Sequence, residues 1–242
     1  MKKIAFYVEG QTEQLFLKRL IVEIAGQKNI AVELQRFQGK YKPKKQITPT
    51  SQLNANPDHY VLLYDCMGDE SVKSRILEDK ESLFNSGYEE IIGLRDLYDF
   101  QLNNLNRLKT TLNDGVTRNG KVIIPPLPKN ATIIIAVREI EDWFLKECSH
   151  FKCVDKSIIL NSEQITQLGF NPCEDNLTKR SSSAVEDLNA VYQLANKSYS
   201  KSKKRLENNT LNCLDYAIIY LRLRDNLPDL KELIDKIDNF LS

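Results

Sequence analysis

The sequence predicts an α/β protein with a mainly parallel sheet flanked by helices and followed by a helical C-terminal part. Short apolar runs rich in β-branched residues alternate with helical patterns in the first 145 residues. Such runs are typical of parallel strands that are covered on both faces. Beyond this region the patterns are helical. We therefore expect residues 1–145 to form an α/β domain and residues 146–242 to form a helical part packed on it.

Five strands are predicted in the N-terminal part, because each apolar run is short and rich in β-branched or aromatic residues. They cover residues 3–8, 31–37, 59–64, 90–94 and 132–137. The last run, Thr-Ile-Ile-Ile-Ala-Val, is apolar on both sides and is predicted to be a central parallel strand. Its carboxyl end should therefore lie beside the ends of the other strands.

A helix is predicted directly after the first strand, because apolar residues recur there at helical spacing up to Gly26. Thr12 is the expected N-cap, and Glu13 suits the positive end of the helix dipole. Further helical segments are expected at residues 70–86, 101–112, 143–149, 183–197, 199–224 and 229–241. Residues 40–58 are predicted to form a loop, and residues 113–130 a loop or a hairpin.

Composition indicates an ordinary globular protein, since 41% of its 242 residues are hydrophobic and 28% are charged. We see neither a signal-peptide core nor a membrane-spanning run, so we predict a cytoplasmic protein without a membrane partner. The five cysteines are odd in number and include no C-x-x-C pair, so reduced thiols are expected. The net charge of +1 means that contact with a polyanion must come from local patches.

Acidic residues follow four of the predicted strands. Glu9, Asp65, Asp96 and Glu139 each come at or soon after a strand end. Ligands of α/β sheets bind outside the carboxyl ends of the strands, and Mg²⁺ prefers carboxylate oxygens. A single acid at a strand end is more often a turn former or a helix cap. Repetition of acids after four strands favours a metal site.

The run VEGQTEQLFL at residues 8–17, between a strand and a helix, resembles the opening motif of Toprim domains. Asp65 with Asp69, and the run IAVREIEDW at residues 135–143, resemble later landmarks of the same group. The likeness is to Toprim-like proteins related to the OLD nucleases, of the short type encoded beside ABC-type ATPases in bacterial antiphage defence. It covers about residues 3–145 and implies a Toprim-like sheet.

The resemblance implies roles for individual residues. Glu9 would act as a general acid or base linked to the metal, with Glu13 as a second catalytic candidate. Glu9, Asp65 and Asp69 would bind Mg²⁺ or Mn²⁺. The second acid of the usual pair lies two residues after the first, but Met67 occupies that position here. The second ligand in this segment therefore stays open.

Glu139 and Glu141 are two further candidate metal ligands. Continued strand geometry would place both side chains on the same side, because residues two apart in a strand share a face. A helix that begins at this point would allow only one of them to reach a metal. Both alternatives stay open at the level of the sequence.

Two basic stretches with interleaved aromatic residues are candidate nucleic-acid contacts. Their lysines include Lys42, Lys44, Lys45, Lys201, Lys203 and Lys204. The alternative for each stretch is a solvated loop or helix face, which is the commoner origin of a charge run.

Together these features predict a metal-dependent Toprim-like nuclease that cleaves DNA or RNA, with DNA or tRNA as substrate. The resemblance implies a toxic effector in antiphage defence that is controlled by a partner ATPase. The chain has no G-x-x-x-x-G-K-[ST] motif, so ATPase activity would belong to the partner. A non-catalytic regulatory subunit of the ATPase complex is the main alternative, and a small-molecule phosphohydrolase is a third. A homodimer is left open.

Overall fold

The computed structural model describes residues 1–38, 45–47, 52–97 and 102–242, which form two compact units. Unit 1 comprises Met1–Asp96, Phe100–Ile135 and Asp235–Ser242. Unit 2 comprises Leu97–Asp99 and Ala136–Ile234. In the described residues, no helix has both the length and the apolar character needed to cross a membrane.

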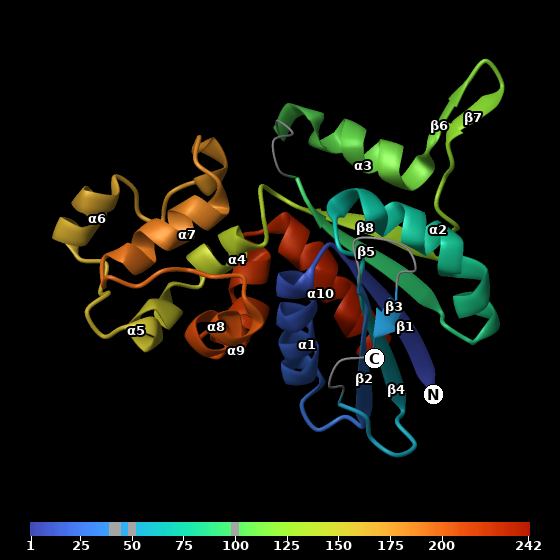
Figure 1. Ribbon diagram of the computed structural model, residues 1–242, viewed down its shortest axis with the longest axis horizontal. Coiled ribbons are helices and arrows are strands. Elements are labelled where there is room, and N and C mark those ends of the chain that lie inside the picture. Colours follow the sequence, from blue (N-terminus) through green and yellow to red (C-terminus); the bar gives the residue numbers. More distant parts are fainter. Residues whose placement is uncertain (39–44, 48–51, 98–101) are drawn as a thin grey trace. The chain divides into compact units, whose positions relative to one another are not determined.

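A six-stranded sheet forms the centre of unit 1 and confirms the predicted α/β class (Figure 1). Its strand order is β3-β2-β4-β1-β5-β8. The strands are β1 (Lys2–Val8), β2 (Ile30–Gln38), β3 (Lys45–Ile47), β4 (His59–Asp65), β5 (Glu90–Asp96) and β8 (Ala131–Ala136). Strands β2, β4, β1 and β5 pair in parallel, and only the short β3 is antiparallel to its neighbour β2 among these pairs.

Strand β8 lies at one edge of the sheet, beside β5, so the predicted central position is wrong. The Ile91 N–H donates to the Asn130 carbonyl, and the Leu97 N–H donates to the Ala136 carbonyl. These bonds advance in the same direction along both strands, so β8 runs parallel to β5. Its residues are apolar on both faces because Ile133, Ile134 and Ile135 are all buried. Burial of both faces therefore does not distinguish a central strand from a covered edge strand.

Helices cover both faces of the sheet, as Figure 1 shows for α1 (Gln11–Ala25) and α2 (Asp69–Asn85). Helix α1 contacts β1, β2 and β4, whereas α2 contacts β1 and β5. The connection from β1 to β2 and the connection from β4 to β5 run in opposite directions along the sheet. Because such crossovers are right-handed, their helices lie on opposite faces. Gly10 is the N-cap of α1, so the prediction that Thr12 would cap it is wrong.

An insertion between β5 and β8 contains α3 (Leu105–Asp114) and a hairpin of β6 (Val116–Arg118) and β7 (Lys121–Ile124). A short 3-10 turn (Leu102–Asn104) precedes α3. The hairpin confirms one of the two alternatives for residues 113–130. Figure 1 shows that it extends from the end of α3.

Unit 2 is helical, as expected for the C-terminal part. Its elements are α4 (Glu141–Lys146), a 3-10 turn (Cys148–His150), α5 (Phe151–Val154), α6 (Ser162–Leu168), a 3-10 turn (Leu177–Lys179), α7 (Ala184–Gln193), α8 (Lys203–Leu206), a π turn (Glu207–Leu211), α9 (Tyr216–Leu221), a 3-10 turn (Leu223–Asp225) and the start of α10 (Pro228–Leu241). The single long segment predicted at residues 199–224 is thus divided into short helices. The Asp215 side chain accepts the Ile218 N–H and starts a new helix, α9, within that segment.

Two disulfides lie within unit 2, so the expectation of reduced thiols is wrong for four of the five cysteines. Cys148 is bonded to Cys173 and Cys153 to Cys213, whereas Cys66 of unit 1 is a free, buried thiol. The Cα–Cα distances are 5.8 and 5.4 Å, which are usual for disulfides. These pairs are separated by 25 and 60 residues. Their proximity arises from the tertiary fold, which motif spacing does not reveal.

Close packing at Gly93 generates the first prediction. A Cβ atom at this position would lie 2.6 Å from Ile133 Cγ1 and 3.0 Å from Val72 Cγ1. We expect Gly93→Ala to lower the free energy of unfolding by about 1–3 kcal/mol, because the core must shift to accept the methyl group. Urea unfolding measures the change, with the exposed Glu81→Ala on α2 as control. Equal stability of Gly93→Ala and wild type would contradict this packing.

Candidate functional site

Three acidic residues of unit 1 come to the carboxyl edge of three neighbouring parallel strands. Strand β1 lies between β4 and β5, and Val8 is paired with Asp65 on one side and with Leu94 on the other. Glu9 follows β1, Asp65 ends β4, and Asp96 ends β5. The chain leaves β1 towards α1 and leaves β4 towards α2, on opposite faces of the sheet. A switch of this kind between adjacent strands is where α/β sheets bind their ligands.

The turns at this edge are held together by hydrogen bonds. Glu9 Oε2 accepts the Asp96 N–H at 3.3 Å, and the Glu9 carbonyl accepts the Gly68 N–H at 2.8 Å. Asp65 Oδ1 accepts the Met67 N–H at 2.9 Å. Met67 and Gly68 have φ angles of 58° and 135°, and the second of these is a conformation that favours glycine. The acids are therefore attached to a turn of defined geometry.

Asp65 and Asp96 are both buried, with exposed fractions of 5% and 1%. Burial raises the pKa of Asp65, while the Met67 N–H and the positive charge of Arg36 oppose the rise. Arg36 is the residue of β2 that pairs with Asp65 in the sheet. A positive charge thus neighbours the acidic edge.

Asp69, the second metal candidate of this segment, forms an ion pair with Arg95 at 2.7 Å. The Asp69 carboxylate already has a charged partner. Asp96, which ends β5, is therefore the better candidate for a third acid beside Glu9 and Asp65. Asp96 was predicted to follow a strand but was not among the predicted metal ligands. Its signal was weaker than that of Asp65, because Arg95 separates Asp96 from the apolar run.

Glu13 and Gly10 lie close together at the start of α1. A Cβ atom on Gly10 would approach Glu13 Oε2 to 3.3 Å. Gly10 has a φ angle of −157°, which any residue adopts, so its small size and not a positive φ suits this position. Glu13 is buried, and the neighbouring Gln14 donates to the Leu63 and Gln35 carbonyls, both at 2.8 Å. These bonds attach the first turn of α1 to β4 and β2.

In unit 2, Glu139 and Glu141 lie beyond the end of β8. Arg138 has a φ angle of 61° and interrupts the extended chain, and α4 begins at Glu141. Continued strand geometry is therefore wrong. Both side chains are nevertheless buried, and a carboxylate oxygen of each lies within 4.8 Å of the other. A helix start thus brings the two carboxylates together, which neither alternative in the sequence analysis anticipated.

Each of these glutamates has polar partners inside unit 2. Glu141 Oε1 accepts the Tyr199 hydroxyl at 2.8 Å and forms an ion pair with Lys201 Nζ at 2.9 Å. Glu139 Oε2 accepts the Val185 N–H at 3.2 Å. The adjacent Asp142 is buried, which raises its pKa to about 7, although Arg138 opposes the rise.

The predicted basic contacts have different positions. Lys201 is engaged with Glu141, whereas Lys203 and Lys204 are exposed in α8. Lys42 and Lys44 lie outside the described residues, and Lys45 begins β3 with a side chain that is not described.

A basic surface that the sequence analysis missed occurs in the insertion of unit 1. Residues 102–130 contain five basic residues and one acid, Asp114. Four of the basic side chains are exposed, namely Arg107, Arg118, Lys121 and Lys129. These four residues are three to eleven positions apart in the sequence, so they form no continuous run of charge. The positive charge of the insertion becomes visible only when it is summed over residues 102–130.

A carboxylate set suits Mg²⁺ or Mn²⁺, because both are hard cations that prefer oxygen ligands. Among the described residues of unit 1, no three acids bring their oxygens within 4.8 Å of one another. Mg²⁺ keeps several waters, so it does not need a closed shell of protein ligands. The donor chemistry of Glu9, Asp65 and Asp96 therefore fits a hydrated cation.

The ion pair between Lys201 and Glu141 generates the second prediction. We expect Lys201→Met to lower the free energy of unfolding by about 1 kcal/mol, because a buried carboxylate loses a partly exposed cation. Lys203→Met in the same segment, where the side chain is exposed, should change it by less than about 0.5 kcal/mol. Urea unfolding at pH 7 compares the two. Equal effects would mean that Lys201 is a solvated lysine available to other partners.

Comparison with known proteins places the chain in a family. No curated protein and no solved structure matches it. One family model, described as a domain of unknown function, matches residues 8–207, which is most of the chain. The match begins directly before Glu9 and includes Asp65, Asp96, Glu139 and Glu141. The chain therefore belongs to the family of the domain of unknown function DUF4276.

Proposed function

We propose that the chain is a magnesium- or manganese-dependent nuclease that hydrolyses phosphodiester bonds at the carboxyl edge of the unit 1 sheet. The observation that carries the proposal is the position of Glu9 and Asp65 on either side of the switch point between β1 and β4. Asp96 adds a third acid at the end of the next strand. Metal-dependent phosphoryl transfer uses a hard cation, and carboxylates at neighbouring strand ends are suitable ligands for one.

Glu9, Asp65 and Asp96 would hold the metal, which when bound neutralises phosphate charge and activates water. Glu9 accepts the Asp96 N–H and would accept or donate a proton in the reaction. The first turn of α1 has no side-chain cap, so its N–H groups can meet phosphate oxygens. Arg36, opposite Asp65 on β2, has an Nε without a hydrogen-bond partner in the described part and supplies positive charge.

Nucleic acid as substrate is supported by the basic insertion of unit 1, which we call the α3–hairpin segment (residues 102–130). Its excess of four positive charges is local, since the whole chain has a net charge of only +1. The exposed Val122 and Ile123 lie next to Lys121 in the hairpin. Exposed cations suit a ligand with charged phosphates, and the neighbouring aliphatic side chains offer it an apolar contact.

The role as an antiphage effector controlled by an ATPase partner follows only from the resemblance and stays a prediction. The same holds for the choice between DNA and tRNA. A cytoplasmic location also stays a prediction, and the two disulfides of unit 2 are more usual in oxidising compartments. Thiol alkylation of protein extracted from its own cells, followed by mass spectrometry, would determine whether these bonds form there.

A non-catalytic, nucleic-acid-binding subunit is the second candidate. The observation in its favour is the ion pair of Asp69 with Arg95. The Arg95 guanidinium supplies positive charge to this carboxylate, so Asp69 has less need of a metal ion. The two candidates differ in one measurement. The nuclease cleaves DNA or RNA when Mg²⁺ or Mn²⁺ is present, whereas the subunit binds nucleic acid and leaves it intact.

The third prediction concerns Glu9. We expect Glu9→Gln to reduce metal-dependent cleavage of labelled DNA and RNA at least about 100-fold, because the variant loses a proton-transfer group. The free energy of unfolding should change by less than about 0.5 kcal/mol, since Glu9 lies beyond the buried strand. Glu89→Gln, an exposed glutamate of the same unit, should retain wild-type activity. Full activity of Glu9→Gln would refute its catalytic role.

The fourth prediction concerns the α3–hairpin segment. We expect Arg118→Glu with Lys121→Glu to weaken nucleic-acid binding and to flatten the slope of log affinity against log salt by roughly 0.7–0.9 per lost contact. The double variant Lys203→Glu with Lys204→Glu tests the basic stretch in α8 in the same way. Fluorescence anisotropy at several salt concentrations measures both. If only the Lys203/Lys204 variant alters the slope, nucleic acid binds at α8 and not at the hairpin.

A further inference from the structure

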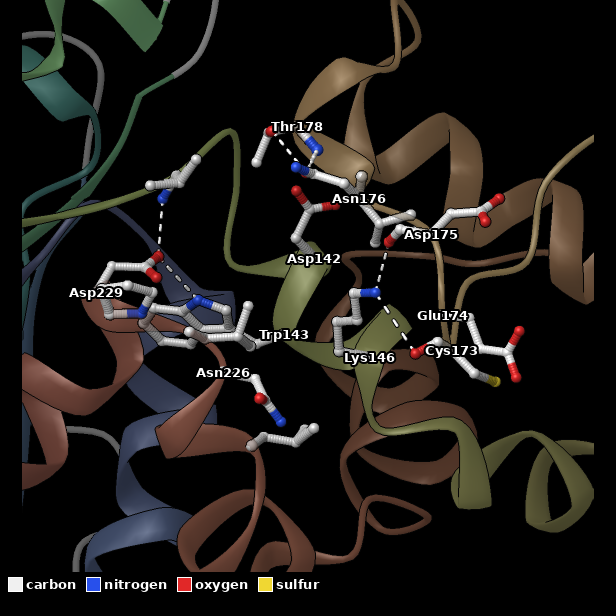
Figure 2. A pocket seen from close by; sticks show the side chains of 15 residues that line it. Asp142, Trp143, Lys146, Cys173, Glu174, Asp175, Asn176, Thr178, Asn226 and Asp229 are labelled. Carbon is white, nitrogen blue, oxygen red and sulfur yellow. Dashed lines mark hydrogen bonds between the residues drawn. The ribbon is translucent and has the colours of Figure 1, made fainter.

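A cavity of about 480 Å³ lies entirely within unit 2 (Figure 2). Helix α4 forms one wall, residues 173–178 form a second, and residues 226–229 at the start of α10 form a third. Its volume is in the range of sites that bind small molecules. Nothing in the proposed hydrolase mechanism uses this cavity.

Trp143 and Asp229 form a rigid, buried part of the lining. Asp229 Oδ2 accepts the Val137 N–H at 2.8 Å and the Trp143 Nε1–H at 3.0 Å, as the dashed lines in Figure 2 show. Asp229 Oδ2 is therefore already hydrogen-bonded to groups of the protein. Trp143 is 1% exposed, so its indole is fixed by the surrounding core.

Asp142 differs from Asp229 because its charge is incompletely compensated. It lines the cavity and is only 5% exposed, and its Oδ1 accepts no hydrogen bond within the described part of the chain. Its ion-pair partner is Arg138 Nη1, at 3.4 Å, and its charge also interacts with that of Lys146. Arg138 also donates to Asp187 Oδ2 at 2.8 Å and to the Ser182 carbonyl at 2.8 Å. The guanidinium is therefore shared, and its shorter contacts are with other groups.

The charge of the lining is negative. It contains four acids, Asp142, Glu174, Asp175 and Asp229, and one base, Lys146. Lys146 Nζ donates to the Asp175 carbonyl at 2.6 Å, and Figure 2 shows its side chain directed towards that segment. Its ammonium thus attaches the second wall to α4. A ligand that enters the cavity therefore meets a lining with more acids than bases.

We propose that this cavity binds a small organic cation, with an ammonium, amidinium or guanidinium group against Asp142 and an apolar body against Leu177, Leu227 and Pro228. The cation would pair with the Asp142 carboxylate, which lines the cavity and whose Oδ1 accepts no hydrogen bond within the described part of the chain. The apolar side chains would remove the ligand body from water. A metal ion is a poorer occupant, because among the described residues the acids of this lining include no three with oxygens within 4.8 Å of one another.

Trp143 allows a direct test, because it is the only tryptophan of the chain and lies in the cavity. Its fluorescence would be titrated in the full-length protein at pH 8 with benzamidine, with the neutral benzamide and with the anionic benzoate. We expect a saturable change with benzamidine and at least tenfold weaker binding of the other two. No saturable change with up to about 10 mM benzamidine, or equal binding of all three, would overturn the proposal.

Two variants separate the charge of Asp142 from its role in folding. Asp142→Asn should weaken benzamidine binding at least tenfold, and so should Thr178→Lys, which places a competing ammonium in the lining. Glu163→Gln, an exposed acid on α6, serves as the control. If Asp142→Asn does not fold, Thr178→Lys decides alone. Wild-type affinity in a folded Asp142→Asn or Thr178→Lys variant would refute the site. None of these readouts depends on nuclease activity.

Discussion

The position of β1 between two parallel neighbours is the constraint on which the rest of unit 1 depends. Residues Ile4–Val8 are all buried and none of them carries a charged side chain. The first charged side chain after them is Glu9, where the strand has ended. The same argument applies to β4 and Asp65. Because the chain leaves β1 and β4 towards helices on opposite faces, the acids at the ends of these strands flank a part of the sheet edge that these two connections leave open.

Buried carboxylates need compensation, and the chain provides it in several ways. The partly exposed Asp69 pairs with Arg95, and the buried Glu141 pairs with Lys201 and the Tyr199 hydroxyl. Asp65 receives one backbone N–H and lies opposite Arg36. Desolvation of an ionised carboxylate is costly without partners, so the residues with weaker compensation are the better candidates for an external cation. This criterion favours Asp65 over Asp69 as a metal ligand.

Much of the fold follows from local pattern, because strand runs and helical spacing are properties of adjacent residues. Five of the six strands of the sheet, the helical C-terminal part and the positions of Glu9 and Asp65 at strand ends were predicted from the sequence, whereas β3 lies in a segment that was predicted to be a loop. Features set by distant residues were not. The edge position of β8 depends on pairing order, and the disulfides depend on tertiary proximity. The start of α4 depends on Arg138, whose positive φ no residue pattern indicates.

Arg138 shows how one residue determines the chemistry of its surroundings in unit 2. A positive φ is unfavourable for a non-glycine residue, by roughly 1 kcal/mol, and must be stabilised by contacts. Its guanidinium supplies them by donating to two carbonyls and to Asp187. Asp187 also binds Arg180 and the Ser182 hydroxyl, so it holds the guanidinium in a fixed orientation. Asp142 lies 3.4 Å from the guanidinium, so its interaction with Arg138 is weaker than that of Asp187. Its buried carboxylate is stabilised most simply by a cation that enters from the cavity.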